Sequence, residues 1–236
     1  MKPSIEIYPA TEWAATVGRR LAARLDEQPR LRLCLPTGNT PSPAYRAFVT
    51  AGGRLDQAEV FLLDEFVLPA GHPARCDVML ATALLHRLPA PPAILRQLDV
   101  GVDDLEAECA RYEGLVAERP LDLTLLGLGT NGHLGLNEPG TARSSLTRVV
   151  ELAPDTVRHA AEYGHGAAPE YGVTIGMKAI LASAEIWLLV TGSHKAEILR
   201  RTLDGPIGPA VPASFLQEHR NTVVLTDEGA AAAVGV

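Results

Sequence analysis

Short apolar stretches that alternate with amphipathic stretches constrain the fold of this chain more than any other feature of its sequence. Strand-like apolar runs occupy residues 31–35, 60–63, 121–127, 185–190 and 222–225. Helix-like patterns begin between them, at Thr11 (as N-cap), Asp77, Val102 and Lys195. The strand-like runs are almost continuously apolar, which is typical of parallel strands covered on both faces. The alternation therefore predicts a doubly wound, mostly parallel α/β sheet with helices on both faces.

The length and composition fit a single domain. The 236 residues suffice for a large core, and we interpret residues 1–236 as one α/β domain. The formal charge of -7 argues against nonspecific binding to nucleic acid. Three scattered cysteines without a C-x-x-C pair indicate a reduced, cytoplasmic protein. We find no signal-peptide core and no apolar run near the roughly 20 residues of a membrane helix, so we expect no membrane partner.

Four loops that follow predicted strands are rich in glycine and in polar or ionisable residues. They read PTGNTP (36–41), DEF (64–66), GLGTNGHLGLNEPG (127–140) and TGSHK (191–195). In an open parallel sheet, ligands bind outside the carboxyl ends of the strands. The opposite edge shows no such concentration, so we expect one functional site at this edge.

Two of these loops have the features of an anion site. Gly38 lets backbone N–H groups approach a ligand, Thr37 and Thr40 add hydroxyl donors, and a helix starting near Ser42 directs its N-terminus at the anion. The same residues are ordinary turn residues, and the loop lacks the Gly-Lys-Ser/Thr ending of a Walker A motif. Lys195 lies at a helix start, which is unfavourable for a cation unless an anionic ligand is near.

The second loop supplies a candidate base. Asp64 follows a buried strand, where partial burial makes a carboxylate suitable for removing a proton from carbon. Phe66 beside it would exclude water. The alternative is that Asp64 and Glu65 are only solvated charges at a strand end.

The third loop supplies a candidate acid–base histidine, His133. Glu138 can hold one imidazole nitrogen and Asn131 can add a hydrogen bond, which prepares a histidine for proton transfer. The glycines let the backbone come close to a ligand. Acid–base groups beside anion loops predict proton transfer on a phosphorylated substrate.

The motifs LPTGNTP, LLDEF, GLGTNGHLGLNEPG and TGSHKAEIL resemble, in this order, the signature loops of the amino-sugar-6-phosphate isomerase/deaminase family. That family includes glucosamine-6-phosphate and galactosamine-6-phosphate deaminases and is related to 6-phosphogluconolactonase. The resemblance runs from about Leu33 to Leu225. It implies a Rossmann-like fold and a reaction without metal or cofactor, in which an amino-sugar 6-phosphate is ring-opened, isomerised to the ketose and loses ammonia.

The resemblance also implies roles for single residues. Asp64 resembles the base that moves a proton from C2 towards C1, and His133 resembles the acid–base group for ring opening. Asn131 and Glu138 would orient the imidazole. The predicted residues that bind the sugar phosphate are Thr37, Gly38, Asn39, Thr40, Gly129 and Lys195.

Two departures from the family bear on the substrate. The stretch GHLGLNEPG (132–140), Cys76 in HPARC and the stretch 211–219 look more like the galactosamine branch, which would give tagatose 6-phosphate. Many glucosamine-6-phosphate deaminases carry a phosphate-binding arginine where this chain has Glu162, with Arg158 or Lys178 as candidate replacements.

A third departure bears on regulation. Arg148 matches a basic allosteric residue of the hexameric bacterial enzyme, but Val150 replaces a lysine. We expect no activation by N-acetylglucosamine 6-phosphate, and a monomer or a small homo-oligomer.

Four alternative functions were weighed. The related 6-phosphogluconolactonases resemble this chain less, because they read Asp-Glu-Arg where it has Phe66 in third place and lack the Asn-Glu-Pro that ends at Pro139. The arginine would supply a cation for the developing oxyanion, and Phe66 does not. A sugar-phosphate sensor would keep the cavity without turnover, but it would not need Asp64, His133 and Glu138 together. A Rossmann-type dehydrogenase and an α/β-hydrolase are disfavoured because G-x-G-x-x-G and G-x-S-x-G are absent.

Overall fold

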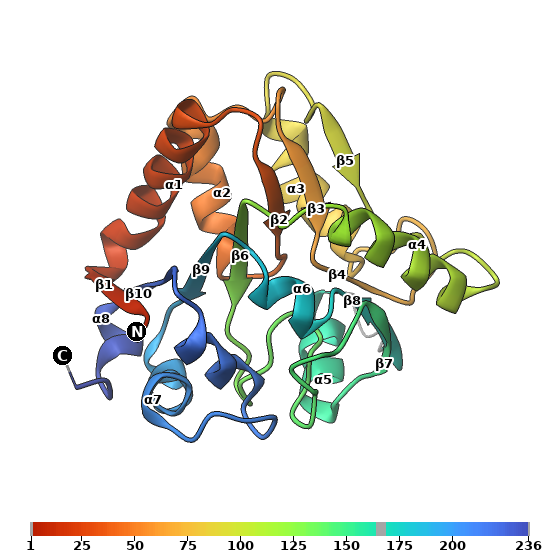
Figure 1. Ribbon diagram of the computed structural model, residues 1–236. Helices are drawn as coiled ribbons and strands as arrows, with labels where there is room; N and C mark the ends of the chain where they lie inside the picture. Colours follow the sequence, from red (N-terminus) through yellow and green to blue (C-terminus); the bar gives the residue numbers. More distant parts are fainter. Residues whose placement is uncertain (1, 164–168, 236) are drawn as a thin grey trace.

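A seven-stranded sheet forms the centre of the molecule. The computed structural model describes residues 2–163 and 169–235, without the side chains at 155, 159, 162 and 163 (Figure 1). Neighbouring strands are parallel throughout the sheet, in the order β1-β10-β9-β6-β2-β3-β5. The strands are β1 (Ser4–Tyr8), β2 (Arg32–Leu35), β3 (Glu59–Leu62), β5 (Ile94–Arg96), β6 (Leu123–Gly127), β9 (Glu185–Val190) and β10 (Thr222–Asp227). The predicted parallel sheet is confirmed.

The strand order places a crevice at the middle of this sheet. From β2 the chain moves outward through β3 to β5, and it then returns to place β6 against the other side of β2. The loops after β2 and β6 therefore leave the sheet in opposite directions. Such a switch point is where open α/β sheets bind their ligands.

Helices cover both faces of the sheet, as the apolar strands require. On β2, Leu33 and Leu35 belong to the core cluster that contains Trp13 and Phe48, whereas Cys34 between them belongs to the cluster of Tyr112. The first face is covered by α1 (Ala10–Glu27), α2 (Pro41–Thr50), α3 (Cys76–Ala83) and α5 (Pro154–Tyr163). The second is covered by α4 (Leu105–Ala117), α6 (Met177–Leu181), α7 (Ala196–Asp204), α8 (Glu228–Ala231) and the 3-10 segment η3 (Pro212–Glu218). The doubly wound interpretation is confirmed.

A second, three-stranded antiparallel sheet lies beside the first and was not predicted. It has the order β4-β8-β7, with β4 at Asp64–Phe66, β7 at Arg148–Glu151 and β8 at Tyr171–Thr174. Figure 1 shows these strands together with α5 at the lower right. The chain leaves the main sheet after Leu62, and Asp64 already belongs to the second sheet. The base predicted at a strand end is therefore held between two sheets.

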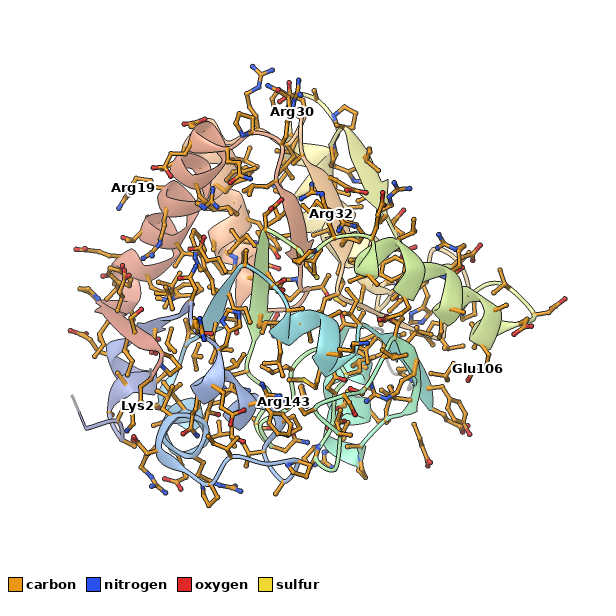
Figure 2. The ribbon with its side chains drawn as sticks, in the orientation of Figure 1. Lys2, Arg19, Arg30, Arg32, Glu106 and Arg143 are labelled. Atoms are coloured by element: carbon orange, nitrogen blue, oxygen red, sulfur yellow. The ribbon has the colours of Figure 1, made fainter. Side chains whose placement is uncertain are left out.

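Charged side chains on three neighbouring strands stabilise the main sheet. Figure 2 shows Arg32 inside the molecule, whereas Arg19 and Arg30 point outward. The Arg32 guanidinium is 1% exposed and its Nε lies 3.0 Å from Glu59 Oε2, and Arg96 Nε lies 2.9 Å from Glu59 Oε1. These ion pairs tie β2, β3 and β5 together at the edge opposite the crevice.

Some predicted helix boundaries were wrong. The helix α1 begins at Ala10 with Pro9 at the N-cap, so Thr11 is inside the first turn and caps nothing. The proline ring fixes φ of Pro9 at a value suitable for the start of a helix. The prediction instead took Thr11 as the cap because threonine is a common N-cap residue. Helix α7 begins at Ala196, with Lys195 as its N-cap at the end of the short 3-10 segment η2 (Ser193–Lys195). Of the helices described, none has the length and apolarity needed to cross a membrane.

Candidate active site

A cavity of about 360 Å³ lies where the predicted loops meet. Its size falls within the range of small-ligand sites. Eight of the ten predicted site residues line it: Thr37, Gly38, Asn39, Thr40, Asp64, Gly129, His133 and Lys195. The other two, Asn131 and Glu138, lie behind His133 and support it. The structure therefore brings all four loops to one place.

Glu138 holds His133 from behind. Its Oε2 lies 3.3 Å from His133 Nδ1, although Nδ1 is not aligned for a directed hydrogen bond. We therefore regard this contact as mainly electrostatic. Burial raises the pKa of Glu138, but the charge and proximity of His133, with hydrogen bonds from Thr156 and Asn131, lower it to about 2. Glu138 is thus a permanent anion next to the imidazole.

Asn131 braces the loop and does not contact the imidazole. Its Nδ2 donates to Glu138 Oε2 at 2.8 Å, and its Oδ1 accepts from the backbone N–H of His133 at 3.1 Å. The predicted orientation of the ring by Asn131 is therefore indirect. Asn131 fixes the carboxylate and the backbone, and these two fix the ring.

Gly129 makes room for the imidazole. A Cβ at this position would lie 2.4 Å from both Cδ2 and Nε2 of His133. The ring therefore packs directly on the backbone of residue 129. This steric requirement explains the glycine at this position, and the residue still lines the cavity.

Asp64 is a buried carboxylate at the cavity wall, with 8% of its surface exposed. Burial raises its pKa to about 6, although a hydrogen bond from the Cys76 thiol and the charge of His133 oppose this rise. Gly135 passes close above it, because a Cβ there would lie 3.3 Å from Asp64 Oδ2. The φ of +58° at Gly135 permits that approach. A carboxylate with this pKa can both take up and release a proton near neutral pH.

The loop after β2 is built as a rigid cradle. Gly38 has a φ of 110°, and its carbonyl accepts a hydrogen bond from Ser42 Oγ at 2.6 Å. Below the loop, the hydroxyl of the buried Tyr45 donates to the Pro36 carbonyl at 2.7 Å. Helix α2 begins directly after Thr40, so its N-terminal dipole adds positive potential. This arrangement suits an anionic group.

Lys195 supplies a cation to the same cavity. Its Nζ donates to the Leu128 carbonyl at 2.8 Å, which draws the side chain across from η2 to the loop after β6. Burial lowers the pKa of this amine to about 8. An anionic ligand would offset that burial and favour the charged form.

Sequence reasoning missed Thr156 on α5. It is buried, lines the cavity, and donates a hydrogen bond to Glu138 Oε1. No local motif marks it, because its partner lies 18 residues away in the chain. His194, next to Lys195, also lines the cavity and was not singled out.

The missing phosphate-binding arginine has no replacement among the described cavity-lining residues, which contain no arginine. Lys178 is exposed on α6, and neither it nor the exposed Arg158 lines the cavity. The side chain of Glu162, like most of the glycine-rich stretch after it, lies outside the described residues. Within the described part, no three His, Cys, Asp or Glu side chains are grouped as metal ligands.

Arg148, the predicted allosteric match, bonds within its own chain. Its guanidinium donates to Asn137 Oδ1 at 2.9 Å and to Thr141 Oγ1 at 3.1 Å. Asn137 in turn donates to the Leu134 and Ile175 carbonyls. Arg148 therefore clamps the segment that carries Glu138.

Comparisons with known proteins agree with this geometry. Two curated proteins named glucosamine-6-phosphate deaminase are each 37% identical to this chain. The one from Rhodopirellula baltica aligns over 236 residues (96% of this chain, 94% of that protein), and the one from Streptococcus equi subsp. zooepidemicus over 203 (84% and 86%).

Solved structures show the same fold. A monomeric glucosamine-6-phosphate deaminase superposes with a TM-score of 0.91 at 34% identity, covering 98% of this chain and 99% of that one. A 6-phosphogluconolactonase from Thermotoga maritima has a TM-score of 0.79 at 21% identity, covering 96% and 100%, and so shares the fold. The family model for glucosamine-6-phosphate isomerases/6-phosphogluconolactonase matches residues 9–225. The chain is a member of the glucosamine-6-phosphate isomerase/6-phosphogluconolactonase family.

Proposed function

We propose that this protein is an amino-sugar-6-phosphate deaminase that converts an amino-sugar 6-phosphate and water to the ketose 6-phosphate and ammonia. One observation carries the proposal: Asp64 and His133, which Glu138 supports from behind, line a single cavity that also contains an anion cradle and Lys195. The relatives named glucosamine-6-phosphate deaminase support the same activity.

Each part of the cavity has a task in this reaction. The cradle from Thr37 to Thr40 and Lys195 bind the phosphate. His133 transfers the proton that opens the sugar ring, and the anion of Glu138 stabilises the imidazolium formed meanwhile. Asp64 then carries a proton from C2 to C1, and its pKa of about 6 suits both removal and return. Water replaces the amino group at C2, and ammonia leaves.

The lactonase alternative is weaker because of the residue next to the base. Hydrolysis of a lactone needs cations for the developing oxyanion. Phe66 lines the cavity at this position and supplies none. The lactonase structure compared above shares the fold at 21% identity, which does not extend to activity.

The substrate can be either of two C4 epimers, glucosamine 6-phosphate or galactosamine 6-phosphate. The curated relatives described above are named for glucosamine 6-phosphate, so this substrate comes first. The preference for galactosamine 6-phosphate, drawn from Cys76 and residues 211–219, stays a prediction.

Free Cys34, Cys76 and Cys109 fit a reducing compartment, and we place the protein in the cytoplasm.

The test is release of ammonia from glucosamine 6-phosphate and galactosamine 6-phosphate, with acid release from 6-phosphogluconolactone measured in parallel. Ammonia from either amino sugar supports the proposal and identifies the epimer. Acid release from the lactone without ammonia release from either amino sugar would indicate a lactonase and contradict the proposal. Tight sugar-phosphate binding without turnover of any substrate would indicate a sensor.

Variants test the assigned roles. His133→Gln removes the ring-opening group and should abolish turnover while the far-UV circular dichroism stays unchanged. Turnover near the wild-type rate would remove His133 from its assigned role.

A further inference from the structure

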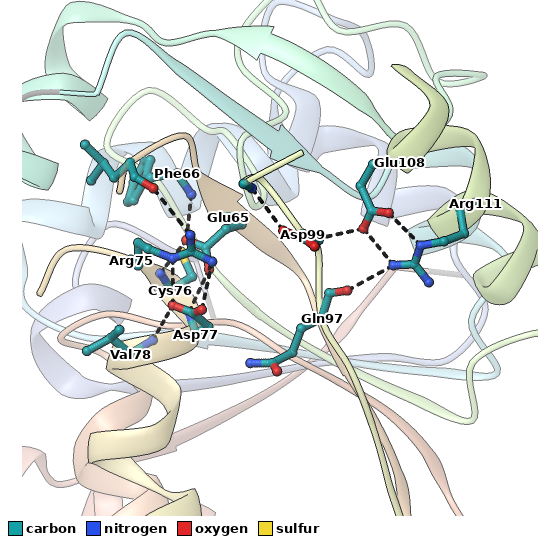
Figure 3. Close-up of polar contacts among 12 residues, drawn as sticks. Glu65, Phe66, Arg75, Cys76, Asp77, Val78, Gln97, Asp99, Glu108 and Arg111 are labelled. Atoms are coloured by element: carbon teal, nitrogen blue, oxygen red, sulfur yellow. Dashed lines mark hydrogen bonds and ion pairs between the residues drawn. The ribbon is translucent and has the colours of Figure 1, made fainter. Parts of the chain in front are cut away.

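Glu65, the neighbour of the proposed base, is a fully buried carboxylate that the reaction does not use. It is 0% exposed. Its Oε1 accepts from the backbone N–H of Phe66 at 2.8 Å and of Cys76 at 2.7 Å, and its Oε2 accepts from Asp77 at 2.8 Å (Figure 3). Two of these donors belong to the first turn of α3. Glu65 therefore ties β4 to the start of that helix.

Arg75 compensates the buried charge. Its guanidinium lies 3.7 Å from Glu65 Oε2 and makes two hydrogen bonds with Asp77, at 3.0 and 2.8 Å (Figure 3). Such a satisfied cluster is rigid, because removal of any member leaves a buried polar group unpaired. The first residue of α3, Cys76, is therefore fixed relative to β4.

Cys76 faces the reaction chamber. Successive residues of a strand point to opposite sides, so Glu65 faces α3 while Asp64 faces the cavity. The Cys76 side chain is 2% exposed and lines the same cavity as Asp64 and Thr37. The thiol interacts with the Asp64 carboxyl group, whose pKa it lowers, and with the Thr37 side chain. It thus connects the base to the first residue of the anion cradle.

We propose that Cys76 is a positioning residue for Asp64, held in place through its backbone by Glu65. The proposal rests on the function proposed above, in which Asp64 is the base. The thiol orients one carboxylate oxygen and leaves the other free towards the substrate. It also fills the space in which water would otherwise solvate the carboxylate.

Three other ionisable groups surround Asp64. Cys34 on β2 and Tyr45 on α2 are buried, and burial holds the pKa of each well above its ordinary value, so both stay neutral. His133 acts through charge from the loop after β6. Cys76 is the neutral neighbour on α3 that lowers the pKa of Asp64, so its removal has a distinct signature.

The experiment measures the titration of Asp64 in substrate-free protein by carbon NMR of labelled aspartate carboxyl groups, with Asp64→Asn assigning the signal. A hydrogen bond to the charged form lowers a carboxyl pKa. In Cys76→Ala the midpoint should rise by about 0.5 pH unit, a roughly threefold change in proton affinity. In Cys76→Ser, whose hydroxyl is the stronger donor, it should fall below the wild-type value. Cys109→Ala, a buried thiol on α4, is the control and should leave it unchanged.

The proposal would be overturned if the Asp64 midpoint moved in the same direction in both Cys76 variants. It would also be overturned if the midpoint moved in neither variant. The S–H stretching band of wild-type Cys76 provides a second readout that needs no altered side chain at this position. This band should move to lower frequency as Asp64 loses its proton. A frequency that stays constant while Asp64 titrates would contradict the proposal. Because neither readout uses substrate, absence of ammonia release would refute the proposed function separately.

Rates complete the test. Cys76→Ala should lower kcat about tenfold with KM changed less than twofold, because a misplaced base slows chemistry without weakening phosphate binding. Cys76→Ser should restore most of the rate. An effect confined to KM would instead place Cys76 in substrate binding.

Discussion

At residue 129, the absence of a side chain is what allows His133 to take its position. An added methyl group would overlap Cδ2 and Nε2 of the imidazole, each at 2.4 Å from the ideal Cβ. The ring would have to move by about an ångström. Displacements of that size cost about 100-fold in rate when they misplace a catalytic group.

We therefore predict that Gly129→Ala folds normally and loses about 100-fold in kcat, measured by ammonia release together with thermal unfolding. The control is Gly114→Ala on the exposed side of α4, where a new Cβ meets nothing within 4 Å. That variant should keep full activity and gain about 0.5–1 kcal/mol, since alanine is the better helix residue. Equal rates in the two variants would contradict the prediction.

Asp64 should show a conflict between activity and stability. Its pKa is raised by burial, so the folded state holds the proton more tightly than the unfolded state does. The stability of the wild type therefore falls as pH rises from about 4 to about 6, and it stays lower above that range.

We predict that Asp64→Asn loses turnover and solvent exchange at C2, yet gains about 2 kcal/mol in unfolding free energy near pH 8. The gain should shrink steeply towards pH 4, where the wild-type carboxyl is protonated in the folded state and about half protonated in the unfolded state. Urea unfolding at both pH values measures it. A gain that does not depend on pH would show that desolvation of the charge is not its source.

The sequence allowed most of the chemical groups to be predicted, but not all of their contacts. Asp64, His133 and Glu138 were identifiable because they follow apolar runs whose carboxyl ends must meet. The indirect role of Asn131 depends on loop geometry, and the anchor at Glu65 depends on where α3 begins. The spacing of residues in the sequence predicts neither of these two features.

Helix α5 contributes to the site through one buried hydroxyl. Thr156 donates to Glu138 on the side opposite Asn131. Loss of one hydrogen bond to a carboxylate costs about 1.5 kcal/mol, or about tenfold in rate if it acts in the transition state.

We predict that Thr156→Val lowers kcat about tenfold with little change in KM, and that Thr156→Ser restores it. The matched control is Thr82→Val on α3, whose exposed hydroxyl donates only to the Val78 carbonyl of its own helix. Steady-state rates on the amino-sugar phosphate measure all three. Failure of serine to rescue would assign the effect to packing.

The five inner strands of the main sheet were predictable, whereas its two edge strands, β1 and β5, and the strands of the small sheet were not. The inner strands of the main sheet are largely apolar on both sides because helices cover both faces, and that pattern is visible locally. By contrast, β4, β7 and β8 have three or four residues each and include Asp64, Glu65 and Arg148. They form strands only because distant parts of the chain pair there, which no local window reveals.

For the whole molecule, we predict a monomer with hyperbolic kinetics. Arg148 bonds to Asn137 and Thr141 of its own chain, and Val150 stands where the hexameric enzyme has a lysine. The structurally similar deaminase is itself described as monomeric. Light scattering should give the mass of one 25.1 kDa chain, and N-acetylglucosamine 6-phosphate should leave the rate curve unchanged. A hexamer or a sigmoidal curve would contradict this.

The order of strands in the main sheet also has a consequence for protein synthesis. β1 lies at the edge of the sheet, and β10 is its neighbour there, between β1 and β9. β1 leaves the ribosome before the other described strands, and β10 leaves after them. β1 therefore stays unpaired until β10, the strand that pairs with it, has been synthesised. Ribosome-bound chains that stop before Thr222 should for this reason bind chaperones, and chains long enough to expose all of β10 outside the ribosome should bind them less.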